Sequence, residues 1–297
     1  MSSQSRLSRA FKNAKKLSFD DTSKLILFSD CHRGDNSFAD DFARNKNIYF
    51  HALSHYFDQG FTYCELGDGD ELWENRSFNE IFRAHENVYL LFKKFYEAGR
   101  FQLIWGNHDM IYRKPNVVKK YWDTYFDRKT NTKKSLLPGV QFEEAIVFKH
   151  TQTGQELFLT HGHQADFMNY VAWRFNRFMV RVLWRPLQVI GIYDPTSPAK
   201  NYSETIKVER RTRKWIGQIG KVVTIIGHTH RPRFPEKNQI PLFNTGSCVH
   251  PRAITGLEIV NGEISLIKWQ IATTKDGVLK IIRVLLEGPQ KLTDFNF

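Results

Sequence analysis

Five apolar segments of the sequence each end in the same few polar residue types, namely aspartate, histidine, asparagine and glycine. The polar groups are Asp30–His32, Gly67–Asp68, Gly106–Asp109, His161–His163 and Gly227–His230. Short apolar runs bounded by turn residues are typical of buried strands. Because ligands of α/β sheets bind beyond the carboxyl ends of the strands, we expect these five groups to converge on one crevice.

The segments around these groups predict the fold class. Strands are expected over 24–30, 61–66 and 101–105, with helical stretches over 41–59 and 77–99 between them. This alternation indicates βαβ units and a parallel sheet covered by helices. Further strands are predicted over 140–150, 156–160, 222–226, 240–243, 254–260, 264–270 and 278–284. The order predicts an α/β protein with two packed sheets and helices outside them.

Length and composition limit the function classes. A chain of 297 residues with 41% apolar residues can form a substantial core. No segment approaches the roughly 18 consecutive apolar residues of a membrane-spanning helix, and residues 1–30 hold no apolar region typical of a signal peptide. The three cysteines lack metal-type spacing. These features favour a reduced, cytoplasmic location.

The chemistry of the polar groups points to metal ions. Carboxylate, imidazole and amide side chains, with no thiolate, suit divalent ions such as Mn²⁺, Fe or Zn²⁺. Asp30 and His32 are two residues apart, as are His228 and His230, so each pair could address one centre on an extended backbone. Any one group alone is more often a loop anchor or a helix cap. Five in succession, each closing a strand, indicate a metal centre.

In this pattern the chain resembles the calcineurin-like metallophosphoesterases. The family motifs read D-x-H, G-D-x-x-[DE], G-N-H-[DE], H-G-H and G-H-x-H, and they match Asp30–His32, Gly67–Glu71, Gly106–Asp109, His161–His163 and Gly227–His230. The resemblance covers roughly residues 24 to 250. It implies a four-layer αββα sandwich of two mixed sheets flanked by helices. It also implies a phosphohydrolase in which a hydroxide held between two metal ions attacks phosphorus.

The resemblance further implies a role for each motif residue. The first ion would be held by Asp30, His32, Asp68 and His230, and the second by Asp68, Asn107, His161 and His228. Seven ligands are too many for one tetrahedral ion and suit two ions that share a carboxylate. Mn²⁺ is the favoured ion, with Fe or Zn²⁺ as alternatives. His108 would stabilise developing charge or protonate the leaving oxygen, with Asp109 orienting its ring.

A narrower resemblance connects the chain with the UDP-2,3-diacylglucosamine pyrophosphohydrolases, which cleave a diphosphate bond and hold acyl chains beneath a helical cap. It rests on Gly227–Pro232, on Asn244–Ser247 and on a basic, aromatic insertion after His163. The chain departs from that branch at His108, at His163 and at Gly69-Asp70. These departures favour a related enzyme with another substrate.

The net charge of +12, from 43 Lys+Arg and 31 Asp+Glu, is concentrated in two segments. Residues 1–16 carry five basic residues and no acidic one, and residues 164–220 carry ten basic and four acidic residues. A protein that coats nucleic acid would spread its charge more widely, so nucleic acid is not the expected partner. A localised acidic partner is expected instead.

The insertion at about 164–220 is predicted to be a helical cap within a catalytic domain spanning 21–297. A basic stripe at helical spacing consists of Arg174, Arg177, Arg181 and Arg185, next to an apolar stripe of Val171, Phe175, Phe178 and Val182. In the commoner arrangement the apolar stripe docks on the domain and the arginines are solvated. Because the stripe lacks acidic partners, we expect these arginines, together with His163, to bind an anionic and partly apolar phosphoester.

Residues 1–20 are interpreted as a basic N-terminal arm. Leu7, Ala10, Phe11, Ala14 and Leu17 recur at helical spacing between basic residues. Such a helix could lie on an anionic membrane surface, which would make the protein peripheral at the membrane. Docking on the domain and disorder are the alternatives.

Several other functions remain open from the sequence. Within the same family, a phosphoprotein phosphatase and a cyclic-nucleotide phosphodiesterase are alternatives, although neither obviously needs a basic cap. A metal-dependent nuclease would use positive charge along a phosphate backbone. A non-catalytic scaffold with the phosphoesterase fold would be expected to lack metal ligands or His108, and none of these is missing. The oligomeric state is not predicted.

Overall fold

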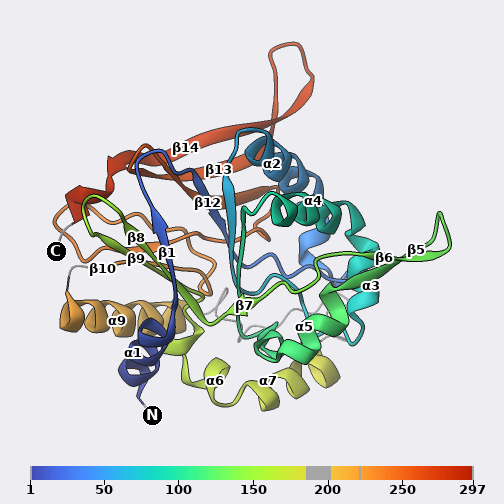
Figure 1. Ribbon diagram of the computed structural model, residues 1–297, viewed down its shortest axis with the longest axis horizontal. Coiled ribbons are helices and arrows are strands. Elements are labelled where there is room, and N and C mark those ends of the chain that lie inside the picture. The colour runs from blue at the N-terminus through green and yellow to red at the C-terminus, as the bar shows by residue number, and fades with distance from the viewer. Residues whose placement is uncertain (1, 185–201, 221, 296–297) are drawn as a thin grey trace.

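Two β-sheets pack face to face in the computed structural model, which describes residues 2–184, 202–220 and 222–295 (Figure 1). The smaller sheet has the strand order β1 (Lys15–Phe19), β8 (Ala145–His150), β9 (Glu156–Thr160), β10 (Val222–Ile226), β11 (Leu242–Asn244). The larger sheet has the order β14 (Leu279–Lys291), β13 (Glu263–Thr273), β12 (Ala253–Val260), β2 (Leu25–Phe28), β3 (Thr62–Leu66), β4 (Phe101–Ile104), β7 (Phe142–Glu143). Both sheets are mixed. In the larger sheet β2, β3, β4 and β7 are parallel whereas β12, β13 and β14 are antiparallel. In the smaller sheet β8 and β9 are antiparallel and the other neighbours are parallel.

Helices form the two outer layers. The larger sheet is covered by α2 (Lys46–Asp58), α3 (Phe78–Ala84), α4 (Glu86–Glu97) and α5 (Pro115–Trp122). The smaller sheet is covered by α1 (Ser3–Asn13) and α9 (Tyr202–Ile219). The four-layer αββα sandwich of two mixed sheets flanked by helices is therefore confirmed (Figure 1).

Side-chain alternation in β2 shows how the sequence specifies these layers. Leu25 and Leu27 point into the core between the two sheets, whereas Ile26 and Phe28 point into the core beneath the helices. Successive strand residues face opposite sides of a sheet, so a continuously apolar strand must be buried on both faces. All four residues are buried.

The predicted helix over 77–99 is two helices, α3 and α4. His85 lies between them and leaves the helical conformation, with φ −129°. Its buried ring Nε2 lies 3.0 Å from Oδ2 of Asp40. The break thus coincides with a tertiary contact, which periodicity does not show.

Several short elements lie between or after the longer strands and helices. They are η1 (Asp41–Arg44), η2 (Met110–Arg113), η5 (Leu292–Phe295) and a small hairpin of β5 (Thr124–Asp127) and β6 (Thr132–Ser135). No helix of the described residues is long and apolar enough to span a membrane.

The N-terminal residues are integrated into the sandwich. Leu7 and Ala10 of α1 are buried against Val147 of β8 and Trp215 of α9, and β1 pairs in parallel with β8 at the edge of the smaller sheet. The segment that the sequence sets apart as a basic arm is thus a helix and an edge strand. The apolar side chains of α1 are occupied in this contact, so the docked alternative is the one that the structure shows.

The insertion after β9 is helical where it is described. It consists of η3 (His163–Ala165), α6 (Phe167–Tyr170), α7 (Trp173–Met179), the π-helical turn η4 (Val180–Trp184) and α9. Figure 1 shows α6 and α7 along one side of the sandwich, below α5. Arg185, one of the predicted cap residues, lies outside the described residues.

Candidate active site

The five predicted polar groups lie at the carboxyl ends of β2, β3, β4, β9 and β10. The parallel pairing of β2 with β3 and of β3 with β4 brings three of these ends to one edge of the larger sheet. The parallel pairing of β9 with β10 does the same in the smaller sheet. Packing of the two sheets then places both edges side by side, and the polar groups of both edges meet there, at a place that we call the crevice.

The backbone is strained at the residues that face this crevice. Five non-glycine residues there have left-handed φ angles between 49° and 66°, namely Asp30, His32, Asp68, His228 and His230. Side chains other than glycine rarely adopt this region, and such residues cluster at functional sites because the surrounding structure must hold them there. The strain corrects one expectation. Asp30 and His32 meet in one group through a sharp turn and not along an extended strand, whereas His228 and His230 fall in different groups.

Two glycines allow the strand ends to approach closely. A Cβ on Gly106 would lie 2.1 Å from Oδ1 of Asp68, and one on Gly227 would lie 2.6 Å from Oδ2 of Asp30. Both positions therefore exclude any side chain. The glycines that open these two motifs therefore leave room for the carboxylates of Asp68 and Asp30.

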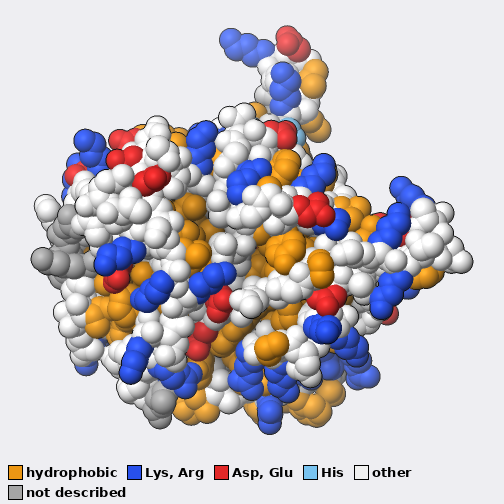
Figure 2. Space-filling view, viewed as in Figure 1, with side chains coloured by type: hydrophobic (Ala, Val, Ile, Leu, Met, Phe, Trp, Pro, Cys, Tyr) orange, Lys and Arg blue, Asp and Glu red, His pale blue; other side chains and the backbone are white. Residues whose placement is uncertain are grey.

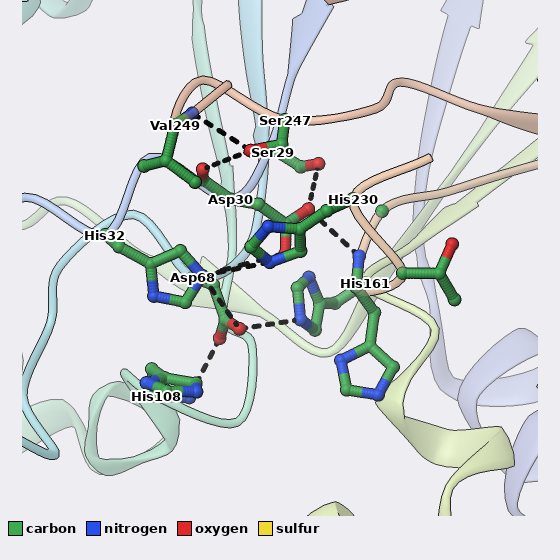
Figure 3. Close-up of polar contacts among 12 residues, drawn as sticks. Ser29, Asp30, His32, Asp68, His108, His161, His230, Ser247 and Val249 are labelled. Atoms are coloured by element: carbon green, nitrogen blue, oxygen red, sulfur yellow. Dashed lines mark hydrogen bonds and ion pairs between the residues drawn. The ribbon is translucent and has the colours of Figure 1, made fainter. Parts of the chain in front are cut away.

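The first group of candidate metal ligands is Asp30, His32, Asp68 and His230 (Figure 3). Nε2 of His230 lies 3.1 Å from Oδ1 of Asp30 and 3.3 Å from Nε2 of His32. Nε2 of His32 lies 3.8 Å from Oδ2 of Asp68. These four side chains point toward one another.

The second group is Asp68, Asn107, His161 and His228. Nε2 of His161 lies 3.1 Å from Oδ2 of Asp68 and 3.2 Å from Oδ1 of Asn107. Ligand atoms of Asp68, His161 and His228 all lie within 4.8 Å of one another. Oδ2 of Asp68 contacts His32 of the first group and His161 of the second, so this carboxylate is shared between them.

The hydrogen bonds of two histidines indicate which ring nitrogens would hold a cation in each group. Nδ1 of His161 donates a hydrogen bond to the backbone oxygen of Leu66 at 2.7 Å, and Nδ1 of His32 donates to Glu71 at 2.7 Å. A ring that binds a cation gives up its second proton, and Nε2 of each ring would then be an acceptor beside carboxylate oxygens. Oδ1 of Asp30 is also buried without a hydrogen-bond donor. Converging acceptors of this kind suit a divalent cation.

Two acidic residues contact the rings of the histidines, and neither was predicted from the sequence to have a role in the site. Glu71 accepts hydrogen bonds from Nδ1 of His32 and of His108, and it was visible only as the last position of the second motif. Oδ2 of Asp166 lies 3.3 Å from Nε2 of His228, and no spacing in the sequence indicates this contact. Carboxylates in such positions fix the orientation of ligand rings.

His108 lies beside the first group, as expected, but Asp109 does not orient it. Nδ1 of His108 lies 2.8 Å from Oε1 of Glu71, whereas Asp109 accepts backbone hydrogen bonds from Gly106 at 2.6 Å and from Gly69 at 2.8 Å. Asp109 therefore ties the loop after β3 to the loop after β4. The predicted role of Asp109 is corrected, because Glu71 holds the ring.

Charges in the crevice shift several pKa values. Burial alone would lower the pKa of His108, but the carboxylates of Glu71 and Asp68 outweigh burial and raise it to about 10. In the same way, Asp68 and Asp30 overcome the effect of burial and raise the pKa of His161 to about 9. Burial, and then the neighbouring Asp68, raises the pKa of Asp109 to about 7. The crevice thus holds an excess of negative charge for a cation to balance.

An aromatic side chain connects His108 with the cap. The ring of Trp73 stacks on that of His108, with 4.1 Å between centroids and 22° between planes. Arg181 of η4 donates from Nε to the backbone oxygen of Trp73 at 3.0 Å and from Nη2 to that of Leu72 at 2.9 Å. Arg181 is therefore the cap arginine that contacts the loop bearing Glu71.

Arg174 and Arg177, together with Arg181, border a cationic pocket of about 450 Å³. The pocket is lined by Ile111, Arg113, Lys114, Trp173, Arg174, Arg177, Phe178 and Arg181. The guanidinium groups of Arg113, Arg174 and Arg177 each lie 5.6 to 5.7 Å from the Trp173 ring centre. No acidic residue is among the lining side chains of the described chain, so the pocket suits an anion.

His163 differs from the expectation that it binds substrate. The side chain is fully buried, and its ring stacks on Tyr170 at 5.5 Å between centroids. Burial, followed by the neighbouring His161 and His228, lowers its pKa well below the usual value. A ring without exposed surface has no access to a substrate in this conformation, so His163 is corrected to a packing residue beside the second group.

Comparison with known proteins adds little to this geometry. No protein-family model matches the chain, and no curated protein matches it in sequence. Among solved structures it is similar to Vps29 of Chaetomium thermophilum, at 9% sequence identity and a TM-score of 0.42. The match covers 90% of this chain and 97% of that one. A similarity at this level gives no information about the activity or the partners of this chain.

Proposed function

We propose that this chain is a dinuclear metal-dependent phosphohydrolase of the calcineurin-like type, acting on a phosphodiester or diphosphate bond. The observation that carries the proposal is the shared position of Asp68. Its carboxylate lies 3.1 Å from His161 in one group of ligands and 3.8 Å from His32 in the other. Two cations that share this carboxylate would lower the pKa of a coordinated water and polarise a phosphoryl group.

The surrounding residues supply the rest of the chemistry. Because Glu71 accepts from Nδ1 of His108, the opposite nitrogen of that ring is free to face a reacting group. His108 would donate a proton to the leaving oxygen from this side. Trp73, stacked on the ring, limits its rotation and excludes water from one face.

The substrate class is inferred from the cationic pocket. Arginine forks bind phosphate with two parallel hydrogen bonds, and aromatic rings accommodate apolar groups. We infer an anionic, nucleotide-linked or lipid-like phosphoester as the substrate, in keeping with the resemblance to the UDP-2,3-diacylglucosamine pyrophosphohydrolases. Mn²⁺ is the ion that we expect, given the oxygen and imidazole ligands.

The proposal is tested by metal analysis combined with turnover of bis(p-nitrophenyl) phosphate. We expect purified protein to hold about two equivalents of a divalent metal and to hydrolyse the diester in a metal-dependent way. Protein that is loaded with metal yet inert toward this diester and toward a pool of nucleotide-lipids, phospholipids, cyclic nucleotides and phosphopeptides would contradict the proposal and support the scaffold alternative.

A further inference from the structure

The helices α6 and α7 and the turn η4 expose an apolar face. Six large apolar side chains on them are exposed over 48% to 60% of their surface, namely Phe167, Met168, Val171, Phe175, Phe178 and Val182. Four of these form the stripe that in the commoner arrangement docks on the domain. In the structure this stripe faces outward, whereas the apolar side of α1 is buried. Contiguous exposed apolar surface of this kind marks an interaction site.

Basic groups surround this face. Residues 167–184 contain three arginines and no acidic residue, and the adjoining pocket adds Arg113 and Lys114. Lys119 and Lys120 follow in the nearby α5. In Figure 2, hydrophobic and basic side chains gather along the edge of the molecule where Figure 1 places α6 and α7. We name the six apolar residues together with Arg174 and Arg177 the cap face.

We propose that the cap face docks on an anionic phospholipid bilayer, with the apolar side chains among the acyl chains and the guanidinium groups on headgroup phosphates. Short helices that combine an apolar face with arginine and aromatic residues bind the plane between headgroups and acyl chains. Arginine also gains from the negative potential of an anionic leaflet. A single partner thus accounts for the exposed apolar residues and for the arginines beside them.

Charge disfavours a second copy of this chain as the occupant. Symmetric pairing through the cap face would bring two arginines and no acidic residue from each copy into one interface. Like charges without partners oppose association at such a contact. A bilayer that contains phosphatidylglycerol or another anionic lipid supplies the missing negative charge.

Docking on a bilayer would place the lipid surface next to the catalytic crevice. Arg181 lies in the same turn as Val182 of the cap face, and it holds the backbone of Leu72 and Trp73. Trp73 in turn stacks on His108. The docking surface stands on exposure and charge alone and does not depend on the proposed hydrolysis.

The test is co-sedimentation of the full chain with vesicles. Vesicles of phosphatidylcholine alone are compared with vesicles that contain about 30 mol% phosphatidylglycerol. We expect binding to the anionic vesicles that weakens as salt rises above about 0.1 M, with little binding to the neutral ones. A double variant, Val171→Ser with Phe175→Ser, should bind the anionic vesicles at least about tenfold more weakly.

Controls separate the possible outcomes. Phe126→Ser, at a comparably exposed phenylalanine of the β5–β6 hairpin, should bind as the parent chain does. Arg174→Glu with Arg177→Glu should reduce binding to anionic vesicles and flatten its salt dependence. Circular dichroism checks that each variant is folded. No vesicle binding, binding that the cap variants do not change, or a concentration-dependent dimer that the serine variants dissociate would each overturn the proposal.

Discussion

The carboxylate of Glu71 holds the ring of His108, with 2.8 Å between Oε1 and Nδ1. The same carboxylate also accepts a hydrogen bond from Nδ1 of His32, a candidate metal ligand. One side chain therefore sets the orientation of a ligand and of the proposed proton donor together. Both rings turn Nε2 toward the crevice as a result, so Glu71 is a positioning residue for the site.

Replacement of Glu71 should show whether this carboxylate positions the rings of His32 and His108. We expect Glu71→Gln to lower kcat on bis(p-nitrophenyl) phosphate by about 10- to 100-fold, because an amide holds the two rings more weakly. The pH profile of kcat should also change, which a merely structural role would not produce. The matched control is Glu80→Gln on the exposed surface of α3. Unchanged kcat and pH profile in Glu71→Gln would count against the positioning role.

Removal of the proposed proton donor should leave the metal centre intact. We expect His108→Ala to keep its metal content and to lose about 10²- to 10⁴-fold in kcat, the usual range for general acid catalysis. Metal analysis and diester turnover are measured on the same sample. His51→Ala on the exposed surface of α2 serves as the control. Loss of metal in His108→Ala would instead make His108 a ligand.

The shared carboxylate should control metal occupancy of both groups. Added Mn²⁺ should raise the Tm of the parent chain, because a ligand that binds only the folded state stabilises it. Asp68→Ala removes an oxygen from both groups, so we expect it to lose most bound metal and most of this rise in Tm. A variant that keeps two equivalents of metal would show that Asp68 is not shared.

Two of the cap arginines, Arg177 and Arg181, should have different effects on catalysis. Arg177 borders the cationic pocket, so Arg177→Ala should raise KM for the natural substrate and spare the small diester. Arg181 also holds the backbone of Leu72 and Trp73, so Arg181→Ala should lower kcat on both substrates. Equal losses from both variants on both substrates would argue against a separate binding pocket.

Cysteine reactivity tests the packing of the sandwich. Cys31, Cys64 and Cys248 are fully buried and free, and burial raises the pKa of Cys64 to about 12. A buried thiol that stays protonated is a poor nucleophile. We expect almost no reaction with a thiol reagent at neutral pH, and reaction of all three cysteines after unfolding. Rapid modification of the folded chain would contradict this packing.

Much of the fold could be predicted because each buried strand is apolar and ends at a turn signal. The strands predicted over 24–30, 61–66 and 101–105 correspond to β2, β3 and β4. β1 was missed because it is an edge strand with alternating exposure and a lysine-rich sequence. The hairpin of β5 and β6 was missed for a similar reason, since β6 is fully exposed and carries no apolar pattern.

The sequence by itself determined the candidate ligands and the layers. Residue type decides what a side chain can coordinate, and strand periodicity decides which way it faces. Only the tertiary structure decided that Glu71, not Asp109, holds His108, that Asp166 supports His228, and that the stripe of Phe175 faces outward. These outcomes depend on contacts between segments distant in the chain, and local pattern carries no information about which of several available partners a side chain meets.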